Sequence, residues 1–185
     1  MPAFYLTLLA VLLAGFGSRD QVTIAGLALR QGQRPATLIV SLVTMALATV
    51  AVVFAATLML AELPPPARAI FVAIALGMAG LESLALVPRR DPKEPTNSLG
   101  ALGLVLVAHQ ITDAARFLVF GMGVGMAAPY ASGVAGLIGG GALVGFAWAM
   151  PHVFEQPFAR WLRRSVGAVL VVVALGLLLS EFHIL

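Results

Sequence analysis

The sequence predicts an all-α polytopic membrane protein with six transmembrane helices, arranged as two inverted three-helix repeats, and with both termini extracytoplasmic. Composition, the placement of cations and two polar interruptions support this fold class. Hydrophobic residues make up 61% of the chain and charged residues 10%, and the mean hydropathy is +1.02, whereas soluble domains are about 25% charged. So few polar residues cannot cover a water-facing surface. The 185 residues suffice for about six spans of about 20 residues each, without a soluble domain.

Each predicted helix is an apolar run that ends at prolines or charges. The runs lie at about residues 3–29, 36–61, 67–87, 99–128, 130–150 and 165–182. Polar or proline-rich segments at 30–35, 64–66, 88–95 and 151–164 separate most of them, and Pro129 begins the fifth helix. Backbone groups cannot stay unpaired in lipid, so these runs must be helices. The apolar residues 1–13 lack the basic region of a signal peptide, and we expect them to belong to the mature protein.

The two halves comprise residues 1–87 and 99–185, and a polar linker at 88–98 joins them. Loop cations predict their orientation, because Lys and Arg gather on the cytoplasmic side of a membrane. The face with the termini and the loops after the second and fourth helices carries only Arg68. The opposite face carries eight cations: Arg30, Arg34, Arg89, Arg90, Lys93, Arg160, Arg163 and Arg164. Three helices in each half then make the halves antiparallel.

The first and fourth helices are each nearly 30 residues long and are interrupted near the middle by polar residues, at 17–21 and 109–116. An offset of 95 residues superimposes the two patches, with Ser18 on Asp113 and Gln21 on Arg116. The small residues that follow also match, since Gly26 falls on Gly121 and Ala28 on Gly123. Gly15 and Gly17 would allow the first helix to be interrupted at little cost in free energy.

Charged residues near the middle of these two helices are the candidate functional groups. A charge near the bilayer centre costs at least about 2.5–3.5 kcal/mol on insertion scales, so it is retained when paired, hydrated or functional. Transporters with inverted repeats place their binding sites at this depth, on interrupted helices. Alternatively, each Arg pairs with an Asp and the charges only join the two halves. The candidate binding residues are Ser18, Arg19, Asp20, Gln21, Gln110, Asp113 and Arg116, with Asp20 and Asp113 as candidate metal ligands.

Two further residues are candidates for a proton relay. Glu82 lies in the third helix and could face the same site, although snorkelling to the cytoplasmic interface is the favoured interpretation. His109 is one helical turn from Asp113, and its unperturbed pKa near 6.5 suits proton transfer. A role as a hydrogen-bonded packing residue is the commoner one for a lone His. The pairs His152 with Glu155 and Glu181 with His183 are too small for a metal site.

Glycines in the second half have the spacing that lets helices approach closely, at Gly121 and Gly125, Gly136 and Gly140, and Gly141 and Gly145. Packing within the chain is the favoured interpretation, and a homo-oligomer is the alternative. The chain has no cysteine, phosphate-binding loop, nucleophile elbow or metalloprotease helix, so we expect no enzymatic activity and no cofactor. Basic residues in short loops indicate topology, and no nucleic-acid partner is expected.

The segment Ala14-Gly15-Phe16-Gly17-Ser18-Arg19-Asp20-Gln21 resembles the signature Ala-Glu-x-Gly-Asp-Lys-Thr-Gln of the GDT family. These membrane proteins are exporters of manganese or calcium, coupled to protons, within the lysine-exporter superfamily. Gly17 and Gln21 match the signature and Arg19 keeps its positive charge. Gly15 and Ser18 replace two signature acids, and in the second half only Asp113 is retained. The resemblance covers nearly the whole chain by its layout of two three-helix halves.

The resemblance implies transport of manganese or calcium, but the replaced acids weaken that implication. Two intact signatures would hold a net charge of about −2, suited to a divalent ion, whereas here Arg19 and Arg116 balance Asp20 and Asp113. The leading hypothesis is a diverged GDT-like secondary transporter, a divalent cation/proton exchanger of the bacterial inner membrane. One alternative is an exporter of a small zwitterion such as an amino acid. The other is a non-transporting membrane subunit whose charges only hold helices together.

Overall fold

The computed structural model describes residues 2–85 and 98–182, which are helical with short connections. Four helices are individually long and apolar enough to cross a membrane: α3 (Pro35–Glu62), α4 (Pro65–Ala85), α7 (Pro129–Ala149) and α8 (Pro157–Glu181). Two bent pairs pass the same test when each is taken as one span. They are α1 (Pro2–Gly15) with α2 (Arg19–Gln31), bent by 57°, and α5 (Leu99–Ile111) with α6 (Ala114–Gly125), bent by 49°.

The predicted interruptions of the first and fourth helices are therefore confirmed. The first break, at residues 16–18, overlaps the predicted polar patch at 17–21, and the second, at 112–113, lies inside the patch at 109–116. The four to six candidate spans indicate a multi-pass integral membrane protein. Almost all of the predicted linker at 88–98, with Arg89, Arg90 and Lys93, lies outside the described residues.

The last helix begins earlier than predicted. A short 3-10 helix, η1 (Pro151–Glu155), follows α7, and α8 then starts at Pro157 rather than near residue 165. Proline is favoured in the first helical turn, because backbone N–H groups there have no partner within the helix and the loss of one costs no hydrogen bond. A search for apolar runs misses this start, because the first turns of α8 carry three arginines. Arg160, Arg163 and Arg164 thus belong to a helix and not to a loop, which corrects the prediction.

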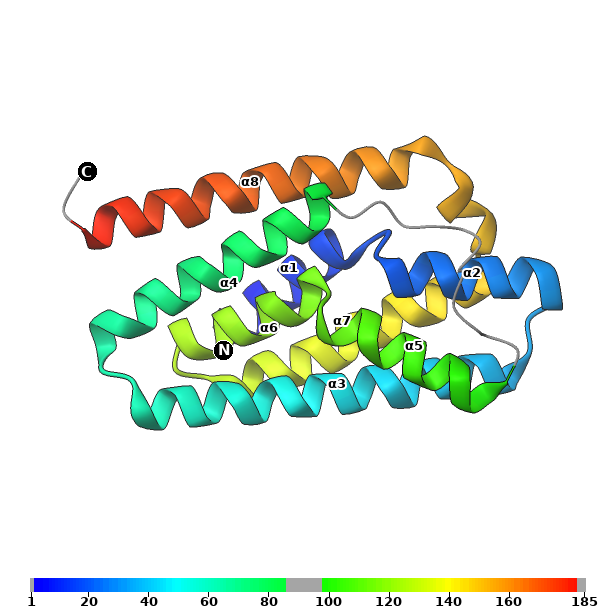
Figure 1. Ribbon diagram of the computed structural model, residues 1–185, viewed down its shortest axis with the longest axis horizontal. Coiled ribbons are helices and arrows are strands. Elements are labelled where there is room, and N and C mark those ends of the chain that lie inside the picture. Colours follow the sequence, from blue (N-terminus) through cyan, green and yellow to red (C-terminus); the bar gives the residue numbers. More distant parts are fainter. Residues whose placement is uncertain (1, 86–97, 183–185) are drawn as a thin grey trace.

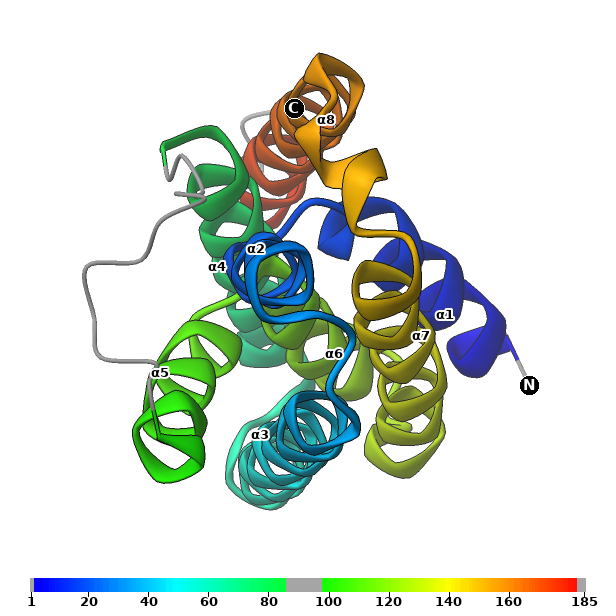
Figure 2. The same ribbon diagram turned by 90° about the vertical axis from the view of Figure 1, so that its right-hand side faces the viewer.

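The helices run roughly parallel to the long axis of the molecule, so their connections gather at its two ends (Figure 1). The connection between α2 and α3 and the one between α7 and α8 lie at one end. The connections between α3 and α4 and between α6 and α7 lie at the other, together with the end of α8. Viewed along the long axis, α2 and α6 lie towards the centre, with other helices around them (Figure 2). The helix breaks are therefore internal.

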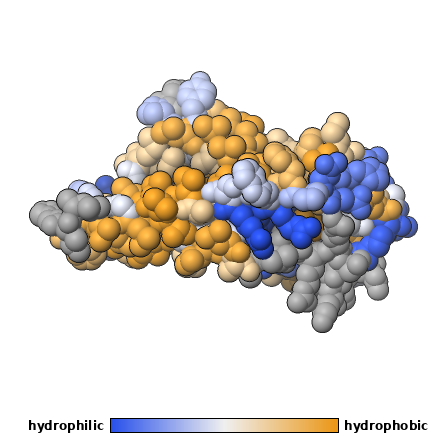
Figure 3. Space-filling view, turned by 90° about the horizontal axis from the view of Figure 1, so that it is seen from above, coloured by the Kyte–Doolittle hydropathy of each residue, from blue (hydrophilic) through white to orange (hydrophobic). Residues whose placement is uncertain are grey.

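Large apolar side chains lie on the outside of the bundle. Leu47 and Phe54 on α3 are 60% and 64% exposed, and Val172 on α8 is 68% exposed. Figure 3 shows the apolar surface on the side of the bundle that α8 covers, with hydrophilic side chains gathered towards the end of the molecule where α8 begins. A soluble protein would not expose so extensive an apolar surface, whereas lipid chains solvate it.

Small residues bring the helices close together. The backbones of α4 and α8 nearly touch, because a Cβ atom on Gly80 would lie 2.7 Å from the carbonyl oxygen of Gly167. The predicted glycine pairs also pack within the chain: a Cβ on Gly125 would lie 2.7 Å from Val72 of α4, and one on Gly136 would lie 2.5 Å from Val119 of α6. Gly145 differs, with no neighbour within 4 Å. Such contacts need glycine, since any side chain would push the helices apart.

Candidate functional site: buried charges at two helix breaks

The break between α1 and α2 is held by the side chain of Gln21. Gly17 has a φ of +76°, which turns the chain out of the helix and favours glycine. The turn frees backbone groups inside the bundle, where each unsatisfied group is costly. Gln21 satisfies two of them, because its Oε1 accepts from the Gly17 N–H at 2.9 Å and its Nε2 donates to the Gly15 carbonyl at 2.6 Å. Gln21, predicted to bind a substrate, thus bridges the break.

Asp20 lies in the first turn of α2 and is 5% exposed. One of its carboxylate oxygens accepts from the Ser18 hydroxyl and from the Gln21 N–H, and the other accepts from Gln110 Nε2 at 3.1 Å. The partial positive charge at the start of a helix further stabilises a carboxylate here. Asp20 is therefore fully hydrogen-bonded and is joined to the other broken helix through Gln110.

The break between α5 and α6 is built differently. Asp113 is the N-cap of α6, and its Oδ2 accepts from the Ala115 N–H at 3.3 Å. Its second carboxylate oxygen, Oδ1, is buried and has no hydrogen-bond partner among the described residues. Gln110, fully buried at the end of α5, also has a buried Oε1 without such a partner. The second break therefore holds two buried acceptors that the described protein does not satisfy.

Asp20 determines which way the Gln110 amide faces. An ionised carboxylate only accepts hydrogen bonds, so the amide group nearest to it must be the NH₂ donor. Gln110 Nε2 accordingly points to Asp20 and to the Ser41 carbonyl, and Oε1 is left for other contacts. The amide orientation is inferred from this bonding pattern.

A second set of charges ties the two breaks to α4 and α8. Glu82 on α4 accepts from Arg163 of α8 with both carboxylate oxygens, and its Oε1 lies 3.4 Å from Arg19 Nε. Arg163 also donates to the Gly17 carbonyl at 2.8 Å, inside the first break. Arg19 donates to the Thr112 hydroxyl at 2.7 Å, inside the second. One acid and two bases thus connect four segments of the bundle.

Arg116 is the exception among the buried charges. It is 3% exposed, and its guanidinium makes neither a hydrogen bond nor an ion pair within 4 Å with another described residue. It does act electrostatically on Asp113, as do Asp20, Glu82 and Arg163. Its Nη1 lies against α7, where a Cβ on Gly140 would come within 3.3 Å of it.

We call the following six residues the buried charge cluster, although only five of them are buried and the Arg19 side chain is 23% exposed: Arg19, Asp20, Glu82, Asp113, Arg116 and Arg163. Its three acids and three bases give a formal charge of zero. A divalent cation needs several oxygen ligands and an excess of negative charge. The described part of the chain contains no group of three or more His, Cys, Asp or Glu side chains that could hold a metal ion. Asp20 and Asp113 stay predicted ligands, but the described acids do not form a divalent-ion cage.

The observed pairing differs from the alternative interpretation of the sequence, in which each Arg of the broken helices pairs with an Asp. Arg19 pairs with Glu82 instead, and Arg116 has no ion pair with a described acid. Adjacent helical residues point about 100° apart, so Arg19 and Asp20 face different neighbours. Glu82 is 7% exposed, so it does not snorkel to the interface as favoured from the sequence. His109 is half-buried on α5, and its relay role stays a prediction.

Arg163 is the functional candidate that the sequence analysis missed, because it was counted as a loop cation. A signal was present. The buried residues of α8 are Ala159, Arg163, Gly167 and Ala174, so the arginine interrupts a line of small residues at helical spacing. A cation on a helix face that is otherwise made of small residues must be buried with its neighbours, and it then needs an acid partner.

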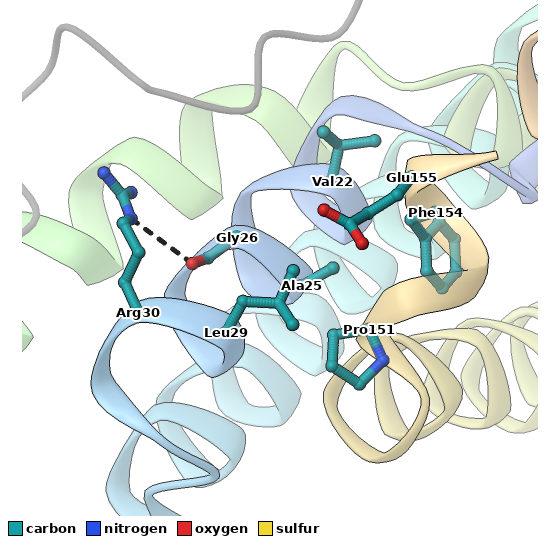
Figure 4. Close-up of a pocket in the computed structure, with 8 residues that line it drawn as sticks. All are labelled: Val22, Ala25, Gly26, Leu29, Arg30, Pro151, Phe154 and Glu155. Atoms are coloured by element: carbon teal, nitrogen blue, oxygen red, sulfur yellow. Dashed lines mark hydrogen bonds between the residues drawn. The ribbon is translucent and has the colours of Figure 1, made fainter. Parts of the chain in front are cut away.

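A separate pocket of about 240 Å³ lies near one end of the bundle, between α2 and η1 (Figure 4). Val22, Leu29 and Phe154 form apolar walls, and Arg30 and Glu155 bring opposite charges to it. The Arg30 side chain donates to the Gly26 carbonyl at 3.3 Å. No member of the buried charge cluster lines this pocket, so the two are distinct features.

Comparisons with protein-family models, with curated proteins and with solved structures found no match to this chain. The features that bear on function are therefore the geometry of the buried charge cluster and the resemblance of the first break to a GDT signature.

Proposed function

We propose that this protein is a secondary transporter of a small cation, exchanged for protons, with its binding site at the junction of the two broken helices. The observation that carries the proposal is the pair of buried acceptors, Asp113 Oδ1 and Gln110 Oε1, that lack a partner among the described residues. Buried polar atoms are nearly always satisfied in proteins. A carboxylate and an amide oxygen are ligands for a hard cation or for a protonated group.

Asp20 and Asp113 have different roles in this proposal. Asp113 binds the cation directly and releases it when it takes up a proton. Asp20 is already hydrogen-bonded and acts by orienting the Gln110 amide, so that Oε1 faces the ion. The N-termini of α2 and α6 support negative charge at both acids.

The correspondence between the two broken helices supports the same function. The first residues of α2 and α6, Arg19 and Ala114, differ by the 95-residue offset found in the sequence, and Ser18 and Asp113 are the corresponding N-caps. Two broken helices that meet at mid-depth are the usual site architecture of inverted-repeat transporters. We further propose that the protein lies in the bacterial inner membrane with both termini outside the cytoplasm, as its loop cations predict.

The zero net charge of the buried charge cluster bears on which ion is transported. The GDT resemblance implies manganese or calcium, but no excess negative charge is present to hold a divalent ion tightly. We therefore include a monovalent cation within the proposal and test Mn²⁺, Ca²⁺ and Na⁺ side by side.

The test is ion flux into proteoliposomes driven by a pH gradient, for wild type, Asp113→Asn and Asp20→Asn. Asparagine keeps the size of the side chain but loses the charge, so we expect each variant to lower the flux at least tenfold, or about 1.4 kcal/mol. Glu62→Gln, at the end of α3, is the matched control and should transport like wild type. Wild-type protein that moves none of the three ions, or Asp113→Asn with full flux, would contradict the proposal.

A second candidate function is export of a small zwitterion, and Arg116 is the observation that favours it. Arg116 Nε and Asp113 Oδ1 are a buried donor and a buried acceptor without hydrogen-bond partners among the described residues. A zwitterion would satisfy both, with its carboxylate on Arg116 and its ammonium on Asp113. Counterflow of labelled amino acids, in wild type but not in Arg116→Gln, would select this function over cation exchange. Absence of both activities would favour the non-transporting subunit.

A further inference from the structure

A groove on the outer surface of the bundle leads to Arg116. It has a volume of about 340 Å³ and lies between α3, α4 and the α5–α6 break. Val52, Phe71 and Phe117 form part of its apolar wall, and Arg116 is the one charged residue among its described lining residues. The other walls are apolar as well, so an occupant must be largely hydrocarbon.

The groove opens towards the lipid-facing surface. Ile74, Met78 and Ile111 at the groove are each nearly half exposed, at 49%, 46% and 46%. They belong to the apolar exterior that would contact acyl chains in a membrane. A ligand of this groove would therefore enter sideways from the bilayer and not from water.

Arg116 predicts the charge of the ligand. An unpaired guanidinium buried in a low-dielectric environment is unfavourable, and a carboxylate is its best partner because two N–H groups can bond both oxygens. Described acids do not fill this role, since Glu82 binds Arg163 and Asp20 accepts from Ser18, Gln21 and Gln110. Asp113 uses one oxygen to cap α6 and forms no ion pair with Arg116.

We propose that this groove binds a single-chain fatty-acid anion from the bilayer, with its carboxylate on Arg116 and its hydrocarbon chain along α4. The lining residues of α4 span from Phe71 to Met78, which is about 10 Å of helix at 1.5 Å per residue. That length suits one chain of medium length. A phospholipid fits less well, because it has two chains and a headgroup much larger than a carboxylate.

The experiment is equilibrium binding of isotope-labelled decanoate to the full-length protein in nanodiscs. We expect saturable binding at one site per chain, weakened at least tenfold in Arg116→Gln and less in Arg116→Lys, which keeps the charge but loses the bidentate geometry. Arg68→Gln is the matched control, because Arg68 donates to the carbonyls of Leu60 and Leu63 outside the groove. It should bind decanoate like wild type.

A second variant keeps the test decisive if Arg116→Gln fails to fold. Ile74→Trp adds bulk at the exposed rim while Arg116 stays intact, and it should also weaken binding. The proposal is overturned if decanoate does not bind saturably, if Arg116→Gln binds it unchanged, or if uncharged decanol binds equally well. It is also overturned if a short-chain phospholipid or a free amino acid displaces decanoate more effectively than unlabelled decanoate does. Binding is measured without an ion gradient, so failure of the flux assay leaves this result intact.

Discussion

At the scale of single residues, Glu82 and Arg163 form the strongest contact of the buried charge cluster. Both are buried, and the arginine bonds both carboxylate oxygens while also donating to the Gly17 carbonyl. Desolvation of two ions offsets much of their attraction, so such a pair adds little net stability compared with apolar residues of the same size. Removing one partner is different, because it leaves the other charge buried and uncompensated.

This difference predicts a non-additive pair of substitutions. Glu82→Met and Arg163→Met should each lower the free energy of unfolding by about 3–5 kcal/mol. The double variant should lose clearly less than the sum, since neither member of the pair is left without the other. Arg19 loses Glu82 in this variant, but its side chain is 23% exposed and keeps its hydrogen bond to Thr112. Unfolding in mixed micelles, followed by circular dichroism, measures the cycle. Additive losses would show that the two side chains do not depend on each other.

Arg116 should behave in the opposite way to Arg163. No described residue pairs with its guanidinium, so Arg116→Met removes an unfavourable buried charge and breaks no ion pair. We expect the melting temperature of the ligand-free protein to be unchanged or higher, measured in the same micelles. A fall as large as that of Arg163→Met would mean that Arg116 has a stabilising partner.

At the scale of secondary-structure elements, the two broken helices are held by side chains and not by backbone bonds alone. Gln21 and Arg163 satisfy the carbonyls that the first break exposes, and Asp113 caps the helix that starts after the second. In lipid, these polar contacts replace the water that would solvate a loop in a soluble protein. The breaks are thus stable features that place charged residues inside the bundle.

Two glycines with nearly the same φ allow the first break to be tested against a matched control. Gly17 and Gly32 have φ values of +76° and +77°, so alanine at either position costs on the order of 1–3 kcal/mol. A Cβ on Gly17 would also come within 3.3 Å of the Ala159 carbonyl oxygen, whereas nothing lies within 4 Å of one on Gly32. Because only Gly17 lies in the break, Gly17→Ala should reduce ion flux and Gly32→Ala should not. Equal effects on flux would argue that the break geometry is irrelevant to transport.

At the scale of the whole molecule, Arg30 in the last turn of α2 and Arg160 near the start of α8 belong to one end of the bundle, and Arg68 near the start of α4 belongs to the other, as the ends of these helices in Figure 1 show. This asymmetry predicts the membrane orientation. The chain has no native cysteine, so single-cysteine variants can be labelled without background. Glu62→Cys should react with a membrane-impermeant maleimide on intact bacterial cells, and Gln33→Cys should react only after permeabilisation. The reverse pattern would invert the proposed topology.

The sequence by itself determined that the chain is helical and suited to a membrane, and where its helices break. These properties are local: apolar content over about 20 residues predicts a span, and clustered glycine and polar residues predict an interruption. The start of α8 escaped this reasoning because its first turns are not apolar.

Only the tertiary structure decided which charges meet. The residue pairs Arg163 and Glu82, Arg163 and Gly17, and Arg19 and Thr112 lie 81, 146 and 93 positions apart in the chain. Their contacts depend on which face each helix turns inward and on how closely glycines let the backbones approach. Among the described residues, the same packing left Arg116 without an ion pair and Asp113 Oδ1 without a hydrogen-bond partner. Pairing across helices is a non-local property, and the spacing of residues along one helix does not encode it.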